Sequence, residues 1–255
     1  MTSRKEQLEY FNQLLDIMED LRAKCPWDKV QTLETLRPLT LEETYELSDA
    51  IIANDLQEIK KEIGDVLLHL VFYSKIGSEE NAFDIGEVVK SLNEKLIFRH
   101  PHIYGDVEVK NEEEVKQNWE KLKLKEGNKS VLGGVPKSLP SLIKAFRMQD
   151  KVKGIGFEFH NPEDAWKKVE EELEEFHAET ELEKKEQELG DVFFSLINYA
   201  RMNGLNPDSA LEKTNNKFLK RFQLMENLAL EKNLKLQNLS LDEMDELWEE
   251  AKKGE

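Results

Sequence analysis

The sequence has very little of the features that mark secreted or membrane proteins. Its 255 residues include one cysteine, Cys25, so no intramolecular disulfide can form. No apolar run approaches the roughly 20 residues that a membrane-spanning helix needs. The first residues, MTSRKEQLEYFNQLLDIMEDL, also lack the apolar core of a signal peptide. We therefore expect a soluble, cytoplasmic protein that does not associate with a membrane.

Positive charge is also scarce. The chain has 36 lysines and arginines against 53 aspartates and glutamates, for a formal net charge of −17. Such a surface repels nucleic-acid phosphates, so we expect no nucleic-acid partner. A smaller polyanion would need a metal ion and a local basic patch in order to bind. The charged and apolar fractions, 35% and 39%, suit a folded helical protein rather than a disordered one.

Acidic residues are concentrated in EEELEEFHAETELEKKEQELGD, residues 170–191. The carboxylates that stand three or four residues apart, as neighbours on a helix do, are Glu171, Glu172, Glu175, Glu188 and Asp191. Glu171, Glu172 and Glu175 form a first group, and Glu188 and Asp191 form a second. The charged segment between the two groups is long enough to end one helix and begin another. The apolar run that follows, VFFSLINYA, must be buried and draws the second group against the first. The pattern predicts two facing helices with a cluster of carboxylates between them.

A cluster of this kind suits a hard divalent cation. Crowded carboxylates repel one another, and removing them from water is costly unless a cation compensates. Mg²⁺ prefers a few carboxylate ligands and leaves its other positions to water and phosphate oxygens. The alternative is a solvated acidic face without a metal, which is common on glutamate-rich helices.

The same pattern occurs earlier in the chain, which favours a site over a charge run. The matching carboxylates in LEETYELSDAIIANDLQEIKKEIGD, residues 41–65, are Glu42, Glu43, Glu46, Glu62 and Asp65. Downstream, NEKLIFR (93–99) aligns with NNKFLKR (215–221), pairing Lys95 with Lys217 and Arg99 with Arg221. Lys217 and Arg221 lie four residues apart on one helical face and could bind phosphate oxygens, or could simply pair with nearby acids.

The repeat predicts an all-α fold of two tandem helical bundles. We expect one domain over 1–110, a linker over 111–140 that holds a helix around Val115, Trp119 and Leu122, and a second domain over 141–255. Arg37-Pro38-Leu39-Thr40 is interpreted as a helix start with Thr40 as N-cap. Asn161-Pro162 and Asn206-Pro207 predict two further starts.

Here the sequence resembles a known family. The duplicated motif EExxE followed by ExxD is similar to that of the MazG nucleoside triphosphate pyrophosphohydrolases. CPWDKVQTLETLRPLTLEETYEL (25–47) and RHPHIYGD (99–106) resemble the first repeat of two-domain MazG proteins, and GIGFEF (154–159) resembles the opening of the second. The carboxylate motif alone is shared with dUTPase-like and phosphoribosyl-ATP pyrophosphohydrolases. The tandem arrangement with these extra segments is more specific.

The resemblance implies Mg²⁺-dependent hydrolysis of a broad range of nucleoside triphosphates to monophosphate and pyrophosphate, for house-cleaning or nucleotide-pool control. It also implies a homodimer. On the same resemblance, Glu172 or Glu175 is expected to orient or deprotonate the attacking water, and the ten carboxylates named above are candidate metal ligands. Trp248 and Lys252, in the last helix, are expected to close over the triphosphate as a tryptophan and a lysine do in the family.

Several alternatives stay open on the sequence. Trp27 could stack on a nucleotide base or plug the end of the bundle, and Cys25 is interpreted as a packing residue. His69 is expected in the core, and the spacing of His100 and His102 does not predict a zinc site. The rival functions are a narrow dUTP or phosphoribosyl-ATP pyrophosphohydrolase and a non-catalytic, metal-binding helical scaffold.

Overall fold

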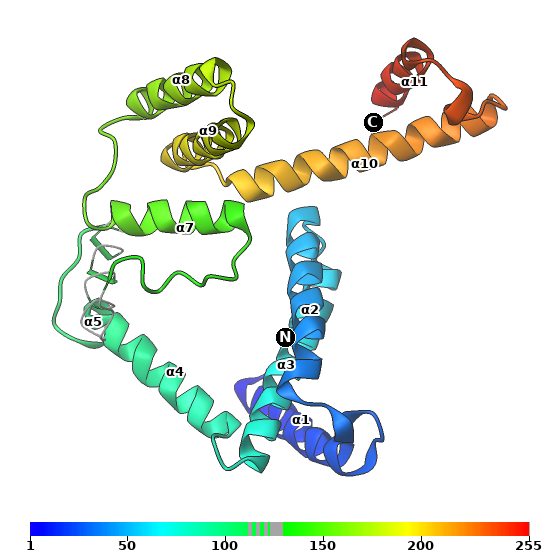
Figure 1. Ribbon diagram of the computed structural model, residues 1–255. Coiled ribbons are helices and arrows are strands. Elements are labelled where there is room, and N and C mark those ends of the chain that lie inside the picture. The colour runs from blue at the N-terminus through cyan, green and yellow to red at the C-terminus, as the bar shows by residue number, and fades with distance from the viewer. Residues whose placement is uncertain (112–113, 116–117, 120–121, 123–129, 255) are drawn as a thin grey trace. The chain divides into compact units, whose positions relative to one another are not determined.

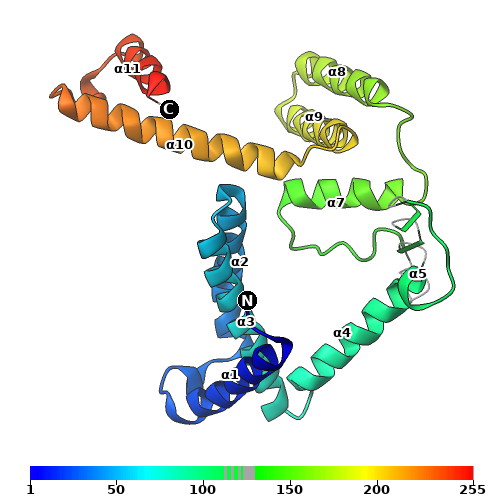
Figure 2. The same ribbon diagram turned by 180° about the vertical axis from the view of Figure 1, so that it is seen from behind.

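The computed structural model describes residues 1–111, 114–115, 118–119, 122 and 130–254. Within these residues every regular element is a helix, which confirms the all-α prediction. Figures 1 and 2 show the helices from opposite sides. The chain divides into two compact units, Met1–Val109 and Lys110–Glu255, each described here by itself. The expected domain and linker boundaries stay predictions, and much of the helix expected around Val115, Trp119 and Leu122 lies outside the described residues.

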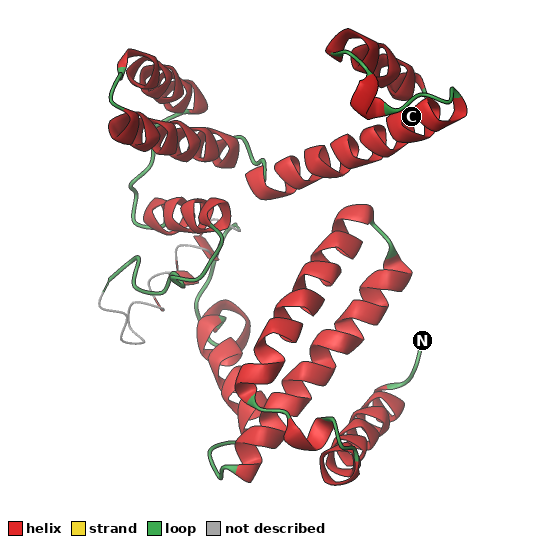
Figure 3. Cartoon of the chain, turned by 45° about the vertical axis from the view of Figure 1, so that its right-hand side comes forward, coloured by secondary structure: helices red, strands yellow, loops and turns green. Residues whose placement is uncertain are grey.

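The first unit is organised around a hairpin of two long helices. Its elements are α1 (Arg4–Lys24), the 3₁₀ turn η1 (Asp28–Val30), α2 (Leu33–Ala53), α3 (Leu56–Glu79), α4 (Ile85–Arg99) and α5 (Pro101–Tyr104). α2 and α3 lie side by side, as Figure 3 shows, and α1 packs against α3. The link between α2 and α3 is tight because Asn54 adopts the left-handed conformation (φ 55°) and Asp55 caps α3.

A small apolar cluster joins α1, α2 and α3. Its buried members are Met18, Leu36, Val71, Phe72 and Ile76. Arg22 closes the same end of the unit: its guanidinium lies over the Phe72 ring, pairs with Glu79 at 2.8 Å and donates to the carbonyl oxygen of Gln31. These contacts fix the loop before α2. Trp27 on this loop is 53% exposed, so it does not plug the bundle end, and its contact with a base stays a prediction.

The predicted helix start at Thr40 is wrong. α2 begins at Leu33, and Thr32 is its N-cap, with a side chain that accepts from the Thr35 amide. Pro38 lies inside the helix. A proline there removes one backbone hydrogen bond, and the packing of α2 on α3 overrides that local cost. Thr40 therefore lies in the helix interior, where its side chain forms hydrogen bonds to α3 instead of capping α2.

Thr40 anchors a polar network between α2 and α3. Its hydroxyl lies 3.0 Å from the Leu36 carbonyl oxygen, 2.9 Å from His69 Nδ1 and 2.5 Å from the Tyr73 hydroxyl. The carbonyl can only accept, so it takes the single hydroxyl proton of Thr40. Nδ1 of His69 and the hydroxyl of Tyr73 thus share the Thr40 hydroxyl as a hydrogen-bond partner. His69, 7% exposed, is thus a hydrogen-bonded core residue, as expected.

The second unit is built around another hairpin. Its elements are α7 (Ser141–Lys153), α8 (Pro162–Ala178), α9 (Leu182–Met202), α10 (Pro207–Glu231), the 3₁₀ turn η2 (Leu236–Asn238) and α11 (Leu241–Lys253). The predicted starts of α8 and α10 are confirmed, with Asn161 and Asn206 as N-caps and proline in the first turn. α8 packs along α9, and α10 packs along α11. Among the described residues, no helix combines the length and apolar character needed to span a membrane.

The network around His69 generates a pH prediction. Burial lowers the pKa of His69 below its ordinary value of 6.5, although the nearby Asp65 carboxylate acts to raise it. A lowered pKa in the folded state means that neutral His69 adds stability above pH 6.5, and that this contribution is lost as the pH falls through the folded pKa. The free energy of unfolding should therefore fall more between pH 7.5 and 5 in the wild type than in His69→Gln.

Urea unfolding at several pH values, followed by circular dichroism, measures this difference. The matched control is Ser195→Ala, at the equivalent position of α9, which should keep the wild-type pH dependence. Equal pH slopes for His69→Gln and the wild type would contradict a buried, neutral His69.

Candidate metal centres

In the first unit the hairpin brings three carboxylates together. Glu43 comes from α2, and Glu62 and Asp65 come from successive turns of α3; one oxygen from each lies within 4.8 Å of the others. Glu62 is only 3% exposed, although it is ionisable. The apolar residues that follow Asp65 on α3 pack in the core and hold this acidic turn against α2.

The second unit repeats the arrangement. Glu172 comes from α8, and Glu188 and Asp191 come from α9; again the three side chains offer oxygens within 4.8 Å of one another. Glu172 is 6% exposed, whereas Asp191 is open to solvent. These three positions are the repeat equivalents of Glu43, Glu62 and Asp65. The internal repeat seen in the sequence is therefore a repeat in three dimensions.

The charges in each cluster raise one another's proton affinity. Desolvation raises the pKa of Glu43 above its ordinary value, with further contributions from the charges of Asp65, Glu46, Glu62 and Glu42. Desolvation likewise raises the pKa of Glu188, with contributions from Glu175, Asp191, Glu172 and Glu179. Both clusters thus favour a species that brings positive charge, either a proton or a cation.

The remaining predicted ligands lie at the edges of these clusters. Glu42, Glu46 and Glu175 are close enough to act on the pKa values just described, although they fall outside the groups of three. Glu171 is exposed, falls outside the group of three and pairs with Lys168 at 2.8 Å. The ligand roles of all ten carboxylates stay predictions.

Two lysines at the clusters were missed by reasoning from the sequence. Lys168 on α8 lies 2.8 Å from Glu171 and 2.8 Å from Glu172. Its spacing, three residues before one glutamate and four before the other, is the signal that could have identified it. Lys61, next to Glu62 in sequence, lies 2.8 Å from that carboxylate and also pairs with Glu58.

The residues of the first cluster fit a hard divalent cation. All three donors are carboxylate oxygens, the type of ligand that Mg²⁺ and Ca²⁺ prefer. Oε2 of Glu62 is buried and has no hydrogen-bond partner among the described residues. A buried carboxylate oxygen without a partner is costly, and a cation ligated by the cluster would satisfy it.

The predicted triphosphate-binding residues gather on a different hairpin, formed by α10 and α11. The Phe218 ring contacts the Trp248 ring at a centroid distance of 5.2 Å, Lys252 pairs with Glu249, and the charge of Arg221 acts on Glu249. α10 leaves the end of α9 and runs along α11, as Figure 1 shows. Among the described residues, no ion pair joins Lys217 to the carboxylates of α8 and α9. The structure therefore assembles the cationic and the acidic parts of the predicted site separately.

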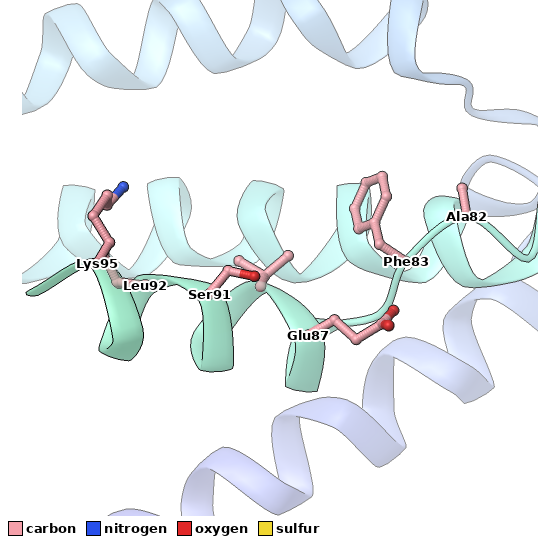
Figure 4. A pocket seen from close by; sticks show the side chains of 7 residues that line it. Ala82, Phe83, Glu87, Ser91, Leu92 and Lys95 are labelled. Carbon is pink, nitrogen blue, oxygen red and sulfur yellow. The ribbon is translucent and has the colours of Figure 1, made fainter. Parts of the chain in front are cut away.

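The equivalent lysine of the first unit lies on a surface groove. Lys95 on α4 and Phe83, just before α4, stand toward opposite ends of a groove of about 650 Å³, with Ser91 and Leu92 between them (Figure 4). None of the residues of α4 is buried. This groove is distinct from the carboxylate cluster on α2 and α3, so in this unit too the basic and acidic residues are on separate elements.

Comparison with known proteins identifies the relatives of this chain. Residues 31–104 match the family described as the MazG nucleotide pyrophosphohydrolase domain, a span that includes the first carboxylate cluster. The chain is 40% identical to the nucleoside triphosphate pyrophosphohydrolase/pyrophosphatase MazG of Thermotoga maritima, over 98% of this chain and 99% of that protein. It is 36% identical to the nucleoside triphosphate pyrophosphohydrolase of Escherichia coli K12, over 97% and 99% of the two chains.

Among solved structures, the crystal structure of a mazG-related protein from Thermotoga maritima aligns with 44% of this chain and 98% of its own. The sequence identity of that alignment is 27% and its TM-score is 0.40. The identity to the two full-length relatives establishes the family. The duplicated acidic motif of this chain, which forms the same cluster in each unit, agrees with it. The chain belongs to the MazG family.

Proposed function

We propose that the chain hydrolyses nucleoside triphosphates, over a broad range of bases and of both sugars, to the monophosphate and pyrophosphate with Mg²⁺ as cofactor. The full-length relatives carry the name of this activity. The observation in this chain that supports it is the pair of three-carboxylate clusters, each enclosed between two packed helices. A triphosphate and a cluster of carboxylates repel each other, so they can share one site only with cations between them.

The second cluster is the proposed site of chemistry. Glu172, Glu188 and Asp191 would hold Mg²⁺, which supplies charge neutralisation and a lowered pKa for a coordinated water. Glu175 borders the cluster and acts on the pKa of Glu188. We assign its carboxylate the role of accepting a proton from the water that attacks the α-phosphorus. Cleavage at that atom releases pyrophosphate, whose growing negative charge requires positive partners.

Those partners are the residues of the α10–α11 hairpin. Lys217 and Arg221 lie four residues apart on α10, and Trp248 packs against Phe218 between them. We assign Lys217, Arg221 and Lys252 to the phosphates and Trp248 to a covering role. Because these residues lie on a hairpin separate from the carboxylates, α10 and α11 must be brought to α8 and α9 for turnover.

We also propose that the working form is a homodimer. The α8–α9 hairpin exposes several large apolar side chains, among them Leu189, Leu196 and Phe193, the last of which is 58% exposed. Contiguous exposed apolar surface of this kind is typical of protein interfaces. A second copy would cover it. The single cysteine and a nucleotide substrate fit a cytoplasmic protein.

Product analysis tests the reaction. Incubation with each of several nucleoside triphosphates and Mg²⁺, resolved by anion-exchange chromatography, should give equimolar monophosphate and pyrophosphate, and none with chelator in place of Mg²⁺. Diphosphate and inorganic phosphate as products would contradict attack at the α-phosphorus. Turnover of dUTP or phosphoribosyl-ATP alone would favour the narrow enzymes, and no turnover of any nucleotide would favour the scaffold.

Matched glutamine substitutions assign the reaction to a unit. Glu175→Gln should lower kcat by roughly 10²–10⁴-fold, because the amide cannot take a proton from water. Glu46→Gln, at the equivalent position of α2, should leave kcat within about twofold. Steady-state pyrophosphate release measures both variants. The reverse outcome, with loss in Glu46→Gln and full rate in Glu175→Gln, would move the chemistry to the first unit.

A further inference from the structure

The two carboxylate clusters differ in how their most buried glutamate is satisfied. In the second unit Lys168 reaches Glu172 from one turn away on the same helix, at 2.8 Å. The residue that stands four positions before Glu43 on α2 is Leu39, which packs against the apolar core of the first unit. No lysine on α2 can therefore do for the first cluster what Lys168 does for the second.

The lysine that does touch the first cluster satisfies only one oxygen. Lys61 Nζ lies 2.8 Å from Glu62 Oε1, and its side chain is 61% exposed and shared with Glu58. Oε2 of Glu62 is left buried without a hydrogen-bond partner among the described residues, on a side chain that is 97% removed from solvent. No oxygen of Glu172 is in this state. The first cluster thus holds a buried carboxylate oxygen without a hydrogen-bond partner among the described residues, whereas the buried glutamate of the second cluster is paired with Lys168.

From this difference we propose that the first cluster binds a divalent cation in the absence of nucleotide, whereas Lys168 occupies the second cluster until a cation and a triphosphate arrive together. The inference deepens the proposed function, because it rests on the same metal role. It gives the units different tasks. The cation at Glu43, Glu62 and Asp65 links α2 to α3 and stabilises the first unit, and the second unit loads its cation with substrate.

The exchange at the second cluster follows from charge. Lys168 is 36% exposed and bridges Glu171 and Glu172, so its ammonium group already supplies one positive charge to the carboxylates. A cation alone must displace that lysine, which weakens its binding. A triphosphate offers the displaced ammonium a new partner, so cation and nucleotide bind better together than either does alone.

Direct binding of Mn²⁺ to the full-length chain, without nucleotide, tests the proposal. Free Mn²⁺ is quantified by its electron paramagnetic resonance signal, and Mn²⁺ substitutes for Mg²⁺ at oxygen sites. The wild type should bind one ion per chain at low Mn²⁺ concentration, and Glu188→Gln should keep this ion. Glu62→Gln and Glu43→Gln, from the two helices of the first cluster, should each weaken its binding at least tenfold.

The role of Lys168 is tested by a variant that should gain a second Mn²⁺-binding site. Lys168→Leu, which introduces the residue found at the equivalent position of α2, should raise the stoichiometry to two ions per chain without nucleotide. Circular dichroism establishes that each variant is folded.

Three outcomes would overturn the proposal: a wild type that binds no ion, retention of the ion by both first-cluster variants, or loss of the ion in Glu188→Gln. Lys168→Leu with unchanged stoichiometry would overturn the role of the lysine. None of these measurements depends on turnover. An absence of hydrolysis would therefore count against the proposed function, whereas the Mn²⁺-binding data alone decide this inference.

Discussion

The mutual repulsion of carboxylates held between packed helices is the constraint on which both units depend. Leu36, Met18 and the apolar turns of α3 bury hydrophobic surface, and that packing forces Glu62 into the same interior. Core packing and charge repulsion therefore oppose each other within a single hairpin. Raised pKa values at Glu43 and Glu188 are the visible consequence. A cation at the cluster would resolve the conflict without loosening the core, and a metal-dependent hydrolase can for this reason tolerate glutamates that few structural proteins bury.

One helical turn from the carboxylates, the side chains that join the two helices differ between the two hairpins. In the first, Thr40, His69 and Tyr73 form a hydrogen-bonded layer one turn from Asp65. The equivalent residues of the second are Val169, Ser195 and Tyr199, and there the ring of Tyr199 contacts Trp166 instead. A polar network specifies one arrangement of its two helices, because sliding would leave buried groups unpaired. The ring contact imposes no such penalty. This contrast fits the roles proposed above, in which the first hairpin would hold its metal ligands in place and the second would admit and release substrate.

Reasoning from the sequence succeeded where the signal is local and periodic. The helix starts at Asn161 and Asn206 depend on short-range capping chemistry, and the carboxylate clusters depend on three- and four-residue spacing that only a helix brings together. It failed where tertiary packing overrides a local rule. Pro38 reads as a break, yet α2 continues through it because its packing on α3 outweighs one lost hydrogen bond. Lys168 was overlooked because a lysine beside glutamates is the commonest surface pattern, and only its contact with buried Glu172 distinguishes it.

The separation of Lys217 from the carboxylates of α8 and α9 has a physical consequence. A lysine or arginine within reach of a carboxylate cluster will pair with it, as Lys168 does with Glu171 and Glu172, and a paired cation is less available to a phosphate. On a chain with a net charge of −17, free positive charge is the scarce resource for binding a triphosphate. The proposed phosphate-binding residue Lys217 lies on α10, and among the described residues no ion pair joins it to the carboxylates of α8 and α9. In the proposed mechanism the triphosphate and its cation would bring the two hairpins together, so that the site would be assembled as the substrate binds.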